Sequence, residues 1–223
     1  MYSFIAQIRS DSVFRRVVFV ILPLMHLTGF LGLQMTATQA FFKALVPFHL
    51  FTTLVLLLIF HTDWNRSAIF FFTVVYLTGF LAEIAGVHTG MIFGHYHYGA
   101  TLGIQLWDVP LIIGANWMVL IYIAGTVANQ WHRSPEIKAL FAAGMVTGLD
   151  FLIEPVAIRL DFWSWEGGEI PFQNYAAWYL ISFGLLWLFY KLPFSKKNKI
   201  AGLLLACQVL FFAAHNLTYI LEQ

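Results

Sequence analysis

The sequence predicts an all-α membrane protein, a polytopic bundle of transmembrane helices that forms a single domain over residues 1–223. Of the 223 residues, 60% are hydrophobic and only 10% are charged, which lies far outside the usage of soluble globular proteins. Seven apolar runs approach the length of about 20 residues that a helix needs to cross the hydrocarbon core. These runs are continuously apolar and lack the alternation of barrel strands, so helices are expected.

The chain divides into these runs in a regular order, without an internal repeat or a low-complexity linker. The first run is as long as the others and is not followed by a small-residue cleavage site, so we expect a retained span rather than a signal peptide. The two longest connections, residues 87–108 and 154–174, then lie on the same side of the membrane. The seven spans are expected near residues 13–33, 41–60, 67–86, 109–128, 136–153, 175–192 and 199–219.

The positions of lysine and arginine predict the orientation, because cytoplasmic loops carry an excess of both. With the N-terminus in the cytoplasm, only Lys43 and Arg159 of the 12 basic residues fall outside. An even number of spans would place the lysine cluster near residues 191–199 on the wrong side. We therefore expect seven spans in a bacterial inner membrane, with a cytoplasmic N-terminus. The basic residues on the cytoplasmic side are Arg9, Arg15, Arg16, Arg66, Arg133, Lys138, Lys191, Lys196, Lys197 and Lys199.

Ionisable side chains gather in the outer half of the predicted bundle, at Glu83, Asp150 and Glu154. Such residues are expensive at membrane depth and usually face the bundle interior, where they act. Asp150 and Glu154 are four residues apart, about 6 Å along one helix face. Both cannot ionise cheaply in a low dielectric, so at least one is expected to keep its proton and to serve as an acid. Plain pairing with Arg159 or with a histidine near the interface remains the alternative for Glu154, which precedes Pro155 at the expected helix end.

Several chemistries have no support in the sequence. The formal net charge of +1, without a large basic block, predicts no nucleic-acid partner. Nucleotide-binding glycine motifs, a nucleophile elbow and a C-x-x-C pair are missing from the sequence, so no cofactor is expected. His88, His95 and His97 are seven and two residues apart, unlike the closely spaced histidine boxes of membrane di-iron enzymes. We expect hydrogen-bonded loop histidines there, and no bound metal.

Aromatic residues are abundant at the outer ends of the spans, at 18% of the whole chain. Tryptophan and tyrosine at this level are mostly interface anchors. Some of them could instead line a slot for a flat polyene and stabilise a carbocation with their ring faces. The stretch FWSWEGG places Trp163 and Trp165 over the predicted polar cluster.

Three blocks of the sequence resemble a known family in their order and spacing. They are AEIAGVHTGMIFGHYHYGATLGIQLWDVPLIIGANW, then GLDFLIEPVAIRLDFWSW, then PFQNYAAW. Together they are similar to the CruF-type carotenoid 1,2-hydratases, over roughly residues 75–190. The positions that match the family's blocks are Glu83, Gly86, Gly90, Gly94, Tyr96, Tyr98, Pro110, Asp150, Pro155, Trp163, Trp165 and Asn174.

The resemblance implies a cofactor-free lyase that adds water across the terminal C1=C2 double bond of an acyclic ψ end group, as in lycopene or γ-carotene. Its partners would be a lipophilic carotenoid, water and membrane lipid. Asp150 is the expected general acid, and Glu83 is its partner or the base that orients water, although the reverse order remains open. Glu154 is the third expected catalytic carboxyl. The expected substrate-binding residues are His88, Tyr96, Tyr98, Asn116, Trp117, Trp163, Trp165 and Asn174.

Two other functions remain open on the sequence alone. A membrane lycopene cyclase would also protonate a ψ end group, but it would quench the cation by ring closure in a dry aromatic pocket. A seven-helix transporter or receptor would need broken helices and a polar path to both faces. The cytoplasmic half of this chain has almost no polar residues for such a path.

Overall fold

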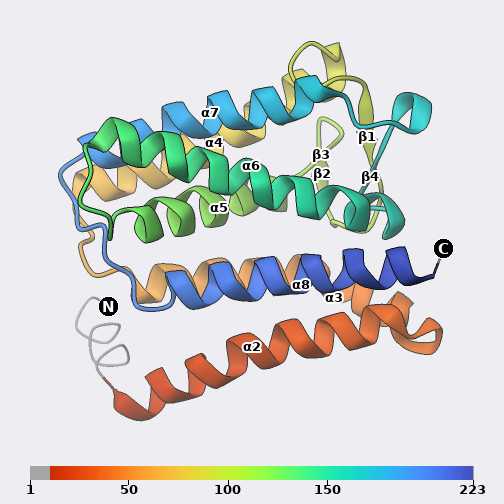
Figure 1. Ribbon diagram of the computed structural model, residues 1–223, viewed down its shortest axis with the longest axis horizontal. Helices are drawn as coiled ribbons and strands as arrows, with labels where there is room; N and C mark the ends of the chain where they lie inside the picture. Colours follow the sequence, from red (N-terminus) through yellow and green to blue (C-terminus); the bar gives the residue numbers. More distant parts are fainter. Residues whose placement is uncertain (1–10, 223) are drawn as a thin grey trace.

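The computed structural model describes residues 11–222 and consists of seven helices that run up and down in two layers (Figure 1). Helix α2 begins at one end of the bundle and α8 finishes at the other. Arg9, one of the basic residues used to predict orientation, lies outside the described residues. The helices are α2 (Ser12–Gln34), α3 (Thr36–Phe60), α4 (Arg66–Thr89), α5 (Ile112–Ala128), α6 (Pro135–Arg159), α7 (Phe172–Lys191) and α8 (Ala201–Leu221).

The predicted helical membrane bundle is confirmed, and each of the seven apolar runs contains a helix. Five helices, α2, α3, α4, α6 and α8, are long and apolar enough to cross a membrane. Helix α5 has only 17 residues, and α7 is not among the five. Seven spans and a cytoplasmic N-terminus therefore stay predictions.

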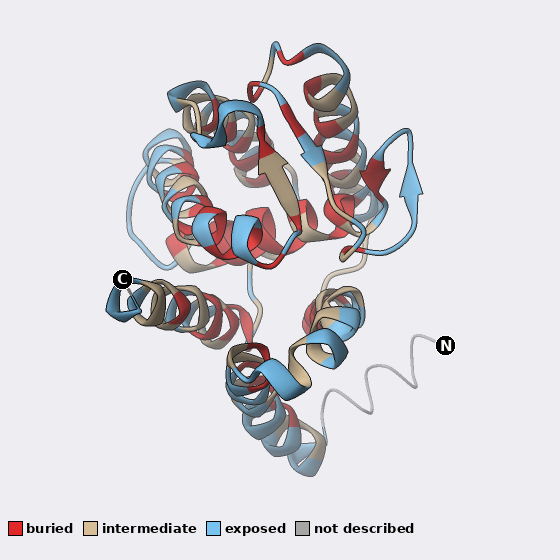
Figure 2. Cartoon of the chain, turned by 90° about the vertical axis from the view of Figure 1, so that its right-hand side faces the viewer, coloured by how far each residue is buried: buried red, intermediate tan, exposed pale blue. Residues whose placement is uncertain are grey.

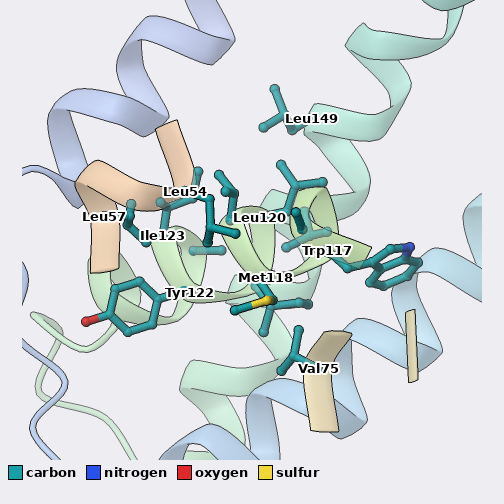
Figure 3. Packing of buried hydrophobic residues seen from close by; sticks show 14 of the residues in the cluster. Leu54, Leu57, Val75, Trp117, Met118, Leu120, Tyr122, Ile123 and Leu149 are labelled. Atoms are coloured by element: carbon teal, nitrogen blue, oxygen red, sulfur yellow. The ribbon is translucent and has the colours of Figure 1, made fainter. Parts of the chain in front are cut away.

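Helix α5 forms the centre of the molecule, because it is apolar all round and almost every residue in it is buried. It packs against α3, α4, α6, α7 and α8. Figure 3 shows Trp117, Leu120 and Ile123 of this helix among side chains of the surrounding helices, including Leu54 and Val75. A short helix suits this position, since its neighbours rather than lipid cover it.

Helix α6 continues to Arg159, so the expectation that it ends at Pro155 is wrong. A proline inside a helix removes one N–H and disturbs the carbonyls of the preceding turn. Asn216 of α8 donates an amide hydrogen to the carbonyl of Leu152, in the turn before Pro155, at 2.8 Å. Glu154 consequently lies within the helix, one turn beyond Asp150, and both are buried.

Four short strands cover one end of the bundle, which we call the strand-bearing end. Three of them lie in segments that were expected to be loops, whereas β3 (Val109–Pro110) occupies the first two residues of the expected span 109–128, so the helix there begins later than predicted. Strand β1 (Tyr96–Tyr98) pairs antiparallel with β4 (Trp163–Trp165), which a short 3₁₀ turn (Glu166–Gly168) follows. Strands β2 (Gln105–Leu106) and β3 form a hairpin. Figure 2 views the molecule from this end, with α4–α7 above and α2, α3 and α8 below.

Candidate active site

Like Glu154, Glu83 is a buried carboxyl with several side-chain donors. It lies on the buried face of α4 and accepts three hydrogen bonds from three separate side chains. The Tyr96 and Tyr98 hydroxyls donate to its Oε2 at 2.5 and 2.8 Å, and the Trp117 indole donates to its Oε1 at 3.0 Å. Donors of this kind favour the ionised form of a carboxyl group.

The β1–β4 pairing places Tyr96 and Tyr98 within hydrogen-bonding distance of Glu83. Side chains alternate across a strand, so Tyr96 and Tyr98 project from one face while His97 projects from the other. The register sets Tyr96 opposite Trp165 and Tyr98 opposite Trp163, and thus four aromatic side chains cover the polar cluster. On the outer face, His97 Nε2 and the Ser164 hydroxyl are 2.8 Å apart.

Trp117 reaches Glu83 because Gly79 leaves room for its ring. A Cβ atom at Gly79 would overlap the Trp117 side chain. The Trp117 ring is completely buried and stacks on Trp178 of α7, with centroids 3.9 Å apart and planes 2° from parallel. This stack ties α5 to α7 and fixes the direction of the indole N–H.

Asp150 and Glu154 lie on the opposite side of the cluster and share one amide. The Asn174 Nδ2 group, at the start of α7, donates to Asp150 Oδ2 at 3.0 Å and to Glu154 Oε1 at 3.3 Å. Glu154 Oε2 also accepts from the indoles of Trp163 and Trp165, at 3.0 and 2.8 Å. Among residues 11–222, the single hydrogen bond recorded at the Asp150 carboxyl is that from Asn174.

A small cavity lies between the three carboxyls, which are each at most 4% exposed. Its volume of about 30 Å³ gives room for roughly two water molecules. We call it the carboxyl cavity. Its lining residues come from four helices, from both strands of the β1–β4 pair and, for Phe93, from the connection between α4 and β1. They are Glu83, Phe93, Tyr96, Tyr98, Ile113, Asn116, Asp150, Glu154, Trp163, Trp165, Asn174 and Trp178.

The two tyrosines remain neutral donors in this setting. Burial, and after it the negative charge of Glu83, raises the pKa of Tyr96. Burial, and after it the negative charge of Glu83, also raises the pKa of Tyr98 well above its usual value. Both phenols therefore keep the proton that they donate to Glu83.

Most of the residues predicted from the sequence come together in this cavity, but His88 does not. Trp117 lies just behind the cavity wall, against Glu83. His88 is half exposed, and its Nε2 is 3.6 Å from Asp108 at the strand-bearing end. It follows Glu83 by five residues, which turns it about 140° around the helix. Three lining residues were not predicted because they carry no polar signal, and they are Phe93, Ile113 and Trp178.

The histidines of the connecting segment are also apart from one another. His97 pairs with Ser164, and His95 packs over Gly90, where α4 ends in a left-handed residue with φ 65°. Across the described residues, 11–222, the structure holds no group of three or more histidine, cysteine, aspartate or glutamate side chains arranged as metal ligands.

The fold and this cavity define a helical membrane protein with a buried acidic site close to one end of the bundle. A family model described as "Carotenoid biosynthesis protein" matches residues 42–221, and the chain belongs to that family. The chain is also similar to the bisanhydrobacterioruberin hydratase of Haloarcula japonica, at 32% identity over 111 residues. That match covers 44% of this chain and 36% of the relative, so it spans about a third of the relative's length. No solved structure matches the chain.

Proposed function

We propose that this protein is a carotenoid hydratase, which adds water across the terminal C1=C2 double bond of an acyclic ψ end group. The observation that carries the proposal is the unequal hydrogen bonding of three buried carboxyls around a cavity of water size. The membership of the carotenoid biosynthesis family and the similarity to a hydratase support it.

Asp150 is proposed as the general acid. Asp150 and Glu154 share a single amide donor, and both are buried, so both being ionised would place two like charges together in a low dielectric. Glu154 has two further indole donors, which favour its charged form. The proton therefore belongs on Asp150, from which it passes to C2 of the alkene and leaves a tertiary cation at C1.

Glu83 is proposed as the base. Its three donors favour its charged form, and it faces the same cavity as Asp150. A water molecule in the cavity attacks C1 with an oxygen lone pair and gives one proton to Glu83. That proton returns to Asp150, through water, before the next turnover. The net change is the addition of one water molecule, without an oxidant or a reductant.

Aromatic rings around the cavity would stabilise the cation before water captures it. Tyr98 and Trp163 meet edge to face, with ring centroids 6.0 Å apart and planes 78° from parallel, and both line the cavity. The face of such a ring attracts a cation by about 2 kcal/mol when water is excluded.

The product formed in heavy-isotope water tests the reaction. The full chain is expressed in lycopene-producing cells, and membranes from these cells are incubated in deuterium oxide or in oxygen-18 water. We expect a 1-hydroxy carotenoid that carries one solvent deuterium at C2 and one solvent oxygen at C1. A product of unchanged composition with a ring at its end would indicate a cyclase and overturn the proposal, as would full product formation by both Asp150→Asn and Glu83→Gln.

A further inference from the structure

A second, larger cavity lies next to the carboxyl cavity, between the two layers of helices. Its volume is about 110 Å³, and its walls are almost entirely apolar. Phe42, Val46 and Leu50 of α3 form one side, and Phe211 and Phe212 of α8 form another. We call this space the apolar groove. It is roughly four times as large as the carboxyl cavity, so the two spaces suit ligands of different size and polarity.

The arrangement of helices explains why this space is not filled. Helices α3 and α8 both pack on α5, and α2 packs on both α3 and α8 (Figures 1 and 2). Helix α2 therefore closes a channel whose floor is α5, and no other described helix occupies the middle. The lining residue Leu45 of α3 is 37% exposed, so the groove is not sealed from the outside of the bundle.

The groove and the carboxyl cavity share part of their walls. Ile113, Asn116 and Trp163 line both spaces. Asn116 lies on the first turns of α5, and no hydrogen bond to its side chain is recorded from residues 11–222. The junction thus has an apolar side, an aromatic ring and one amide that is able to bind water.

One polar atom in the groove lacks a partner. Gln208 of α8 is 6% exposed, it lines the groove, and its Oε1 accepts no hydrogen bond from any described residue. Buried polar atoms are rarely left unpaired in native proteins, and each exception calls for an explanation. Water that enters the groove would donate to this acceptor, whereas a hydrocarbon has no donor for it.

We propose that the apolar groove binds the hydrocarbon chain of a linear carotenoid and brings its terminal double bond to the junction at Ile113, Asn116 and Trp163. This inference rests on the proposed function and assigns the substrate to a place. The carboxyl cavity has room for water but not for a branched isoprenoid end, so it holds the acid, the base and the water. The groove holds the hydrocarbon, and the reaction occurs where the two spaces meet.

Gly29 of α2 offers a way to fill the groove without touching the carboxyls. It lines the groove, and a Cβ atom there would meet only Phe211, at an ordinary contact distance of 3.6 Å. The remaining atoms of a leucine would project into the space that the polyene needs. Val46→Phe blocks the same space from α3. Gly184→Leu on α7 is the matched control, since Gly184 is exposed, lies within a helix, and has open space where a Cβ atom would be added.

The experiment measures lycopene binding to the purified full chain in lipid nanodiscs, by quenching of tryptophan fluorescence. All variants carry Asp150→Asn, so that turnover does not interfere. The parent protein carries Asp150→Asn alone. We expect saturable binding to this parent and to its Gly184→Leu variant, and a Kd raised by about tenfold or more in its Gly29→Leu and Val46→Phe variants. Thermal unfolding is measured alongside, to show that each variant is folded.

Two results would overturn the groove as the binding site. One is the lack of saturable lycopene binding to the parent, and the other is unchanged binding in folded Gly29→Leu and Val46→Phe. A failure of the hydratase proposal gives a different result. Lycopene would still bind, and its Kd would still rise in the groove variants, but the wild-type chain would form no hydrated product.

Discussion

The two walls of the carboxyl cavity differ in the number of hydrogen-bond donors that they supply to each carboxyl group. On the α4 wall, Glu83 alone receives three donors, from β1 and from α5. On the α6 wall, Asp150 and Glu154 share the amide of Asn174, and the two indole donors go to Glu154. On the α4 wall three donors serve one carboxyl group, while on the α6 wall three donors serve two.

This difference is the basis of the proposed roles of acid and base, since all three groups are carboxyls. Carboxyl groups are interchangeable in isolation, but a donor-rich environment holds an anion and a donor-poor one retains a proton. A pair of titratable groups whose surroundings favour opposite protonation states is the usual arrangement for acid and base in one site. Substitutions on each wall test this contrast, from the largest expected effect to the smallest.

Asp150→Asn should cause the largest loss. An amide of the same shape cannot protonate an alkene, and general acid catalysis contributes about 10² to 10⁴ in rate. We expect hydrated product to fall by about 10³-fold or more, measured by chromatography and mass of the pigments. Glu154→Gln, one helical turn away, is the matched control and should lose less. The reverse order of these two variants would move the acid to Glu154.

Glu83→Gln should affect both activity and stability. The amide NH₂ would face at least one of the three donors, which leaves a buried hydrogen-bonding group unpaired, at a cost of about 1–3 kcal/mol. We expect a loss of product of about 10²-fold and a lower thermal midpoint in detergent. If Glu83→Gln were as stable and as active as the wild type, the α4 wall would not be organised around an anion.

Tyr98→Phe should change the dependence of stability on alkaline pH. The raised pKa of Tyr98 means that the folded chain keeps a proton that the unfolded chain releases above about pH 10. The stability from this proton is complete below that pH and is lost as the pH rises toward the folded pKa. We expect thermal midpoints of Tyr98→Phe to fall less steeply than those of the wild type between about pH 10 and 11.5.

A control for this measurement is Trp163→Phe, which removes an indole but no titrating proton. Its midpoints should follow the wild-type slope in the same pH range. Parallel curves for all three proteins would show that the pKa of Tyr98 is not raised in the folded chain.

Trp163→Phe should itself have the smallest effect on product formation. Glu154 would lose the donor at 3.0 Å but keep the Trp165 indole at 2.8 Å and the Asn174 amide. We expect a loss of a few-fold, corresponding to about 1 kcal/mol, in initial rates of hydration. The double variant with Trp165→Phe should lose more than the sum of the two single effects, since no indole would then contact Glu154.

Some of the site could be predicted from the sequence because helical periodicity is a local property. Asp150 and Glu154 are four residues apart, and this spacing alone places them on one face of α6. The same rule excludes His88 from the face of Glu83, although His88 was expected to belong to the site. Strands β1 and β4 were missed because three residues are too few to establish a period. Their sequences, YHY and WSW, do show the alternation of a strand, and this was the one signal available.

Other features required contacts between distant segments. Tyr96 and Trp165 pair across β1 and β4 although they are far apart in sequence, and the pairing depends on how α4 and α6 end. Trp178 carries no polar signal, and its role in the site comes from stacking on Trp117. The apolar groove was not predicted, since a space between helices is a property of their packing rather than of any one segment.

The sequence by itself determined that this chain is a helical membrane protein and that Glu83, Asp150 and Glu154 are its costly polar residues, because both conclusions depend on composition and on spacing along one helix. Only the tertiary structure decided which donor reaches which carboxyl, and where a space is left for water and hydrocarbon. The physical reason is that a hydrogen bond acts over about 3 Å, and distances of that size between separate helices are set by the packing of the whole bundle.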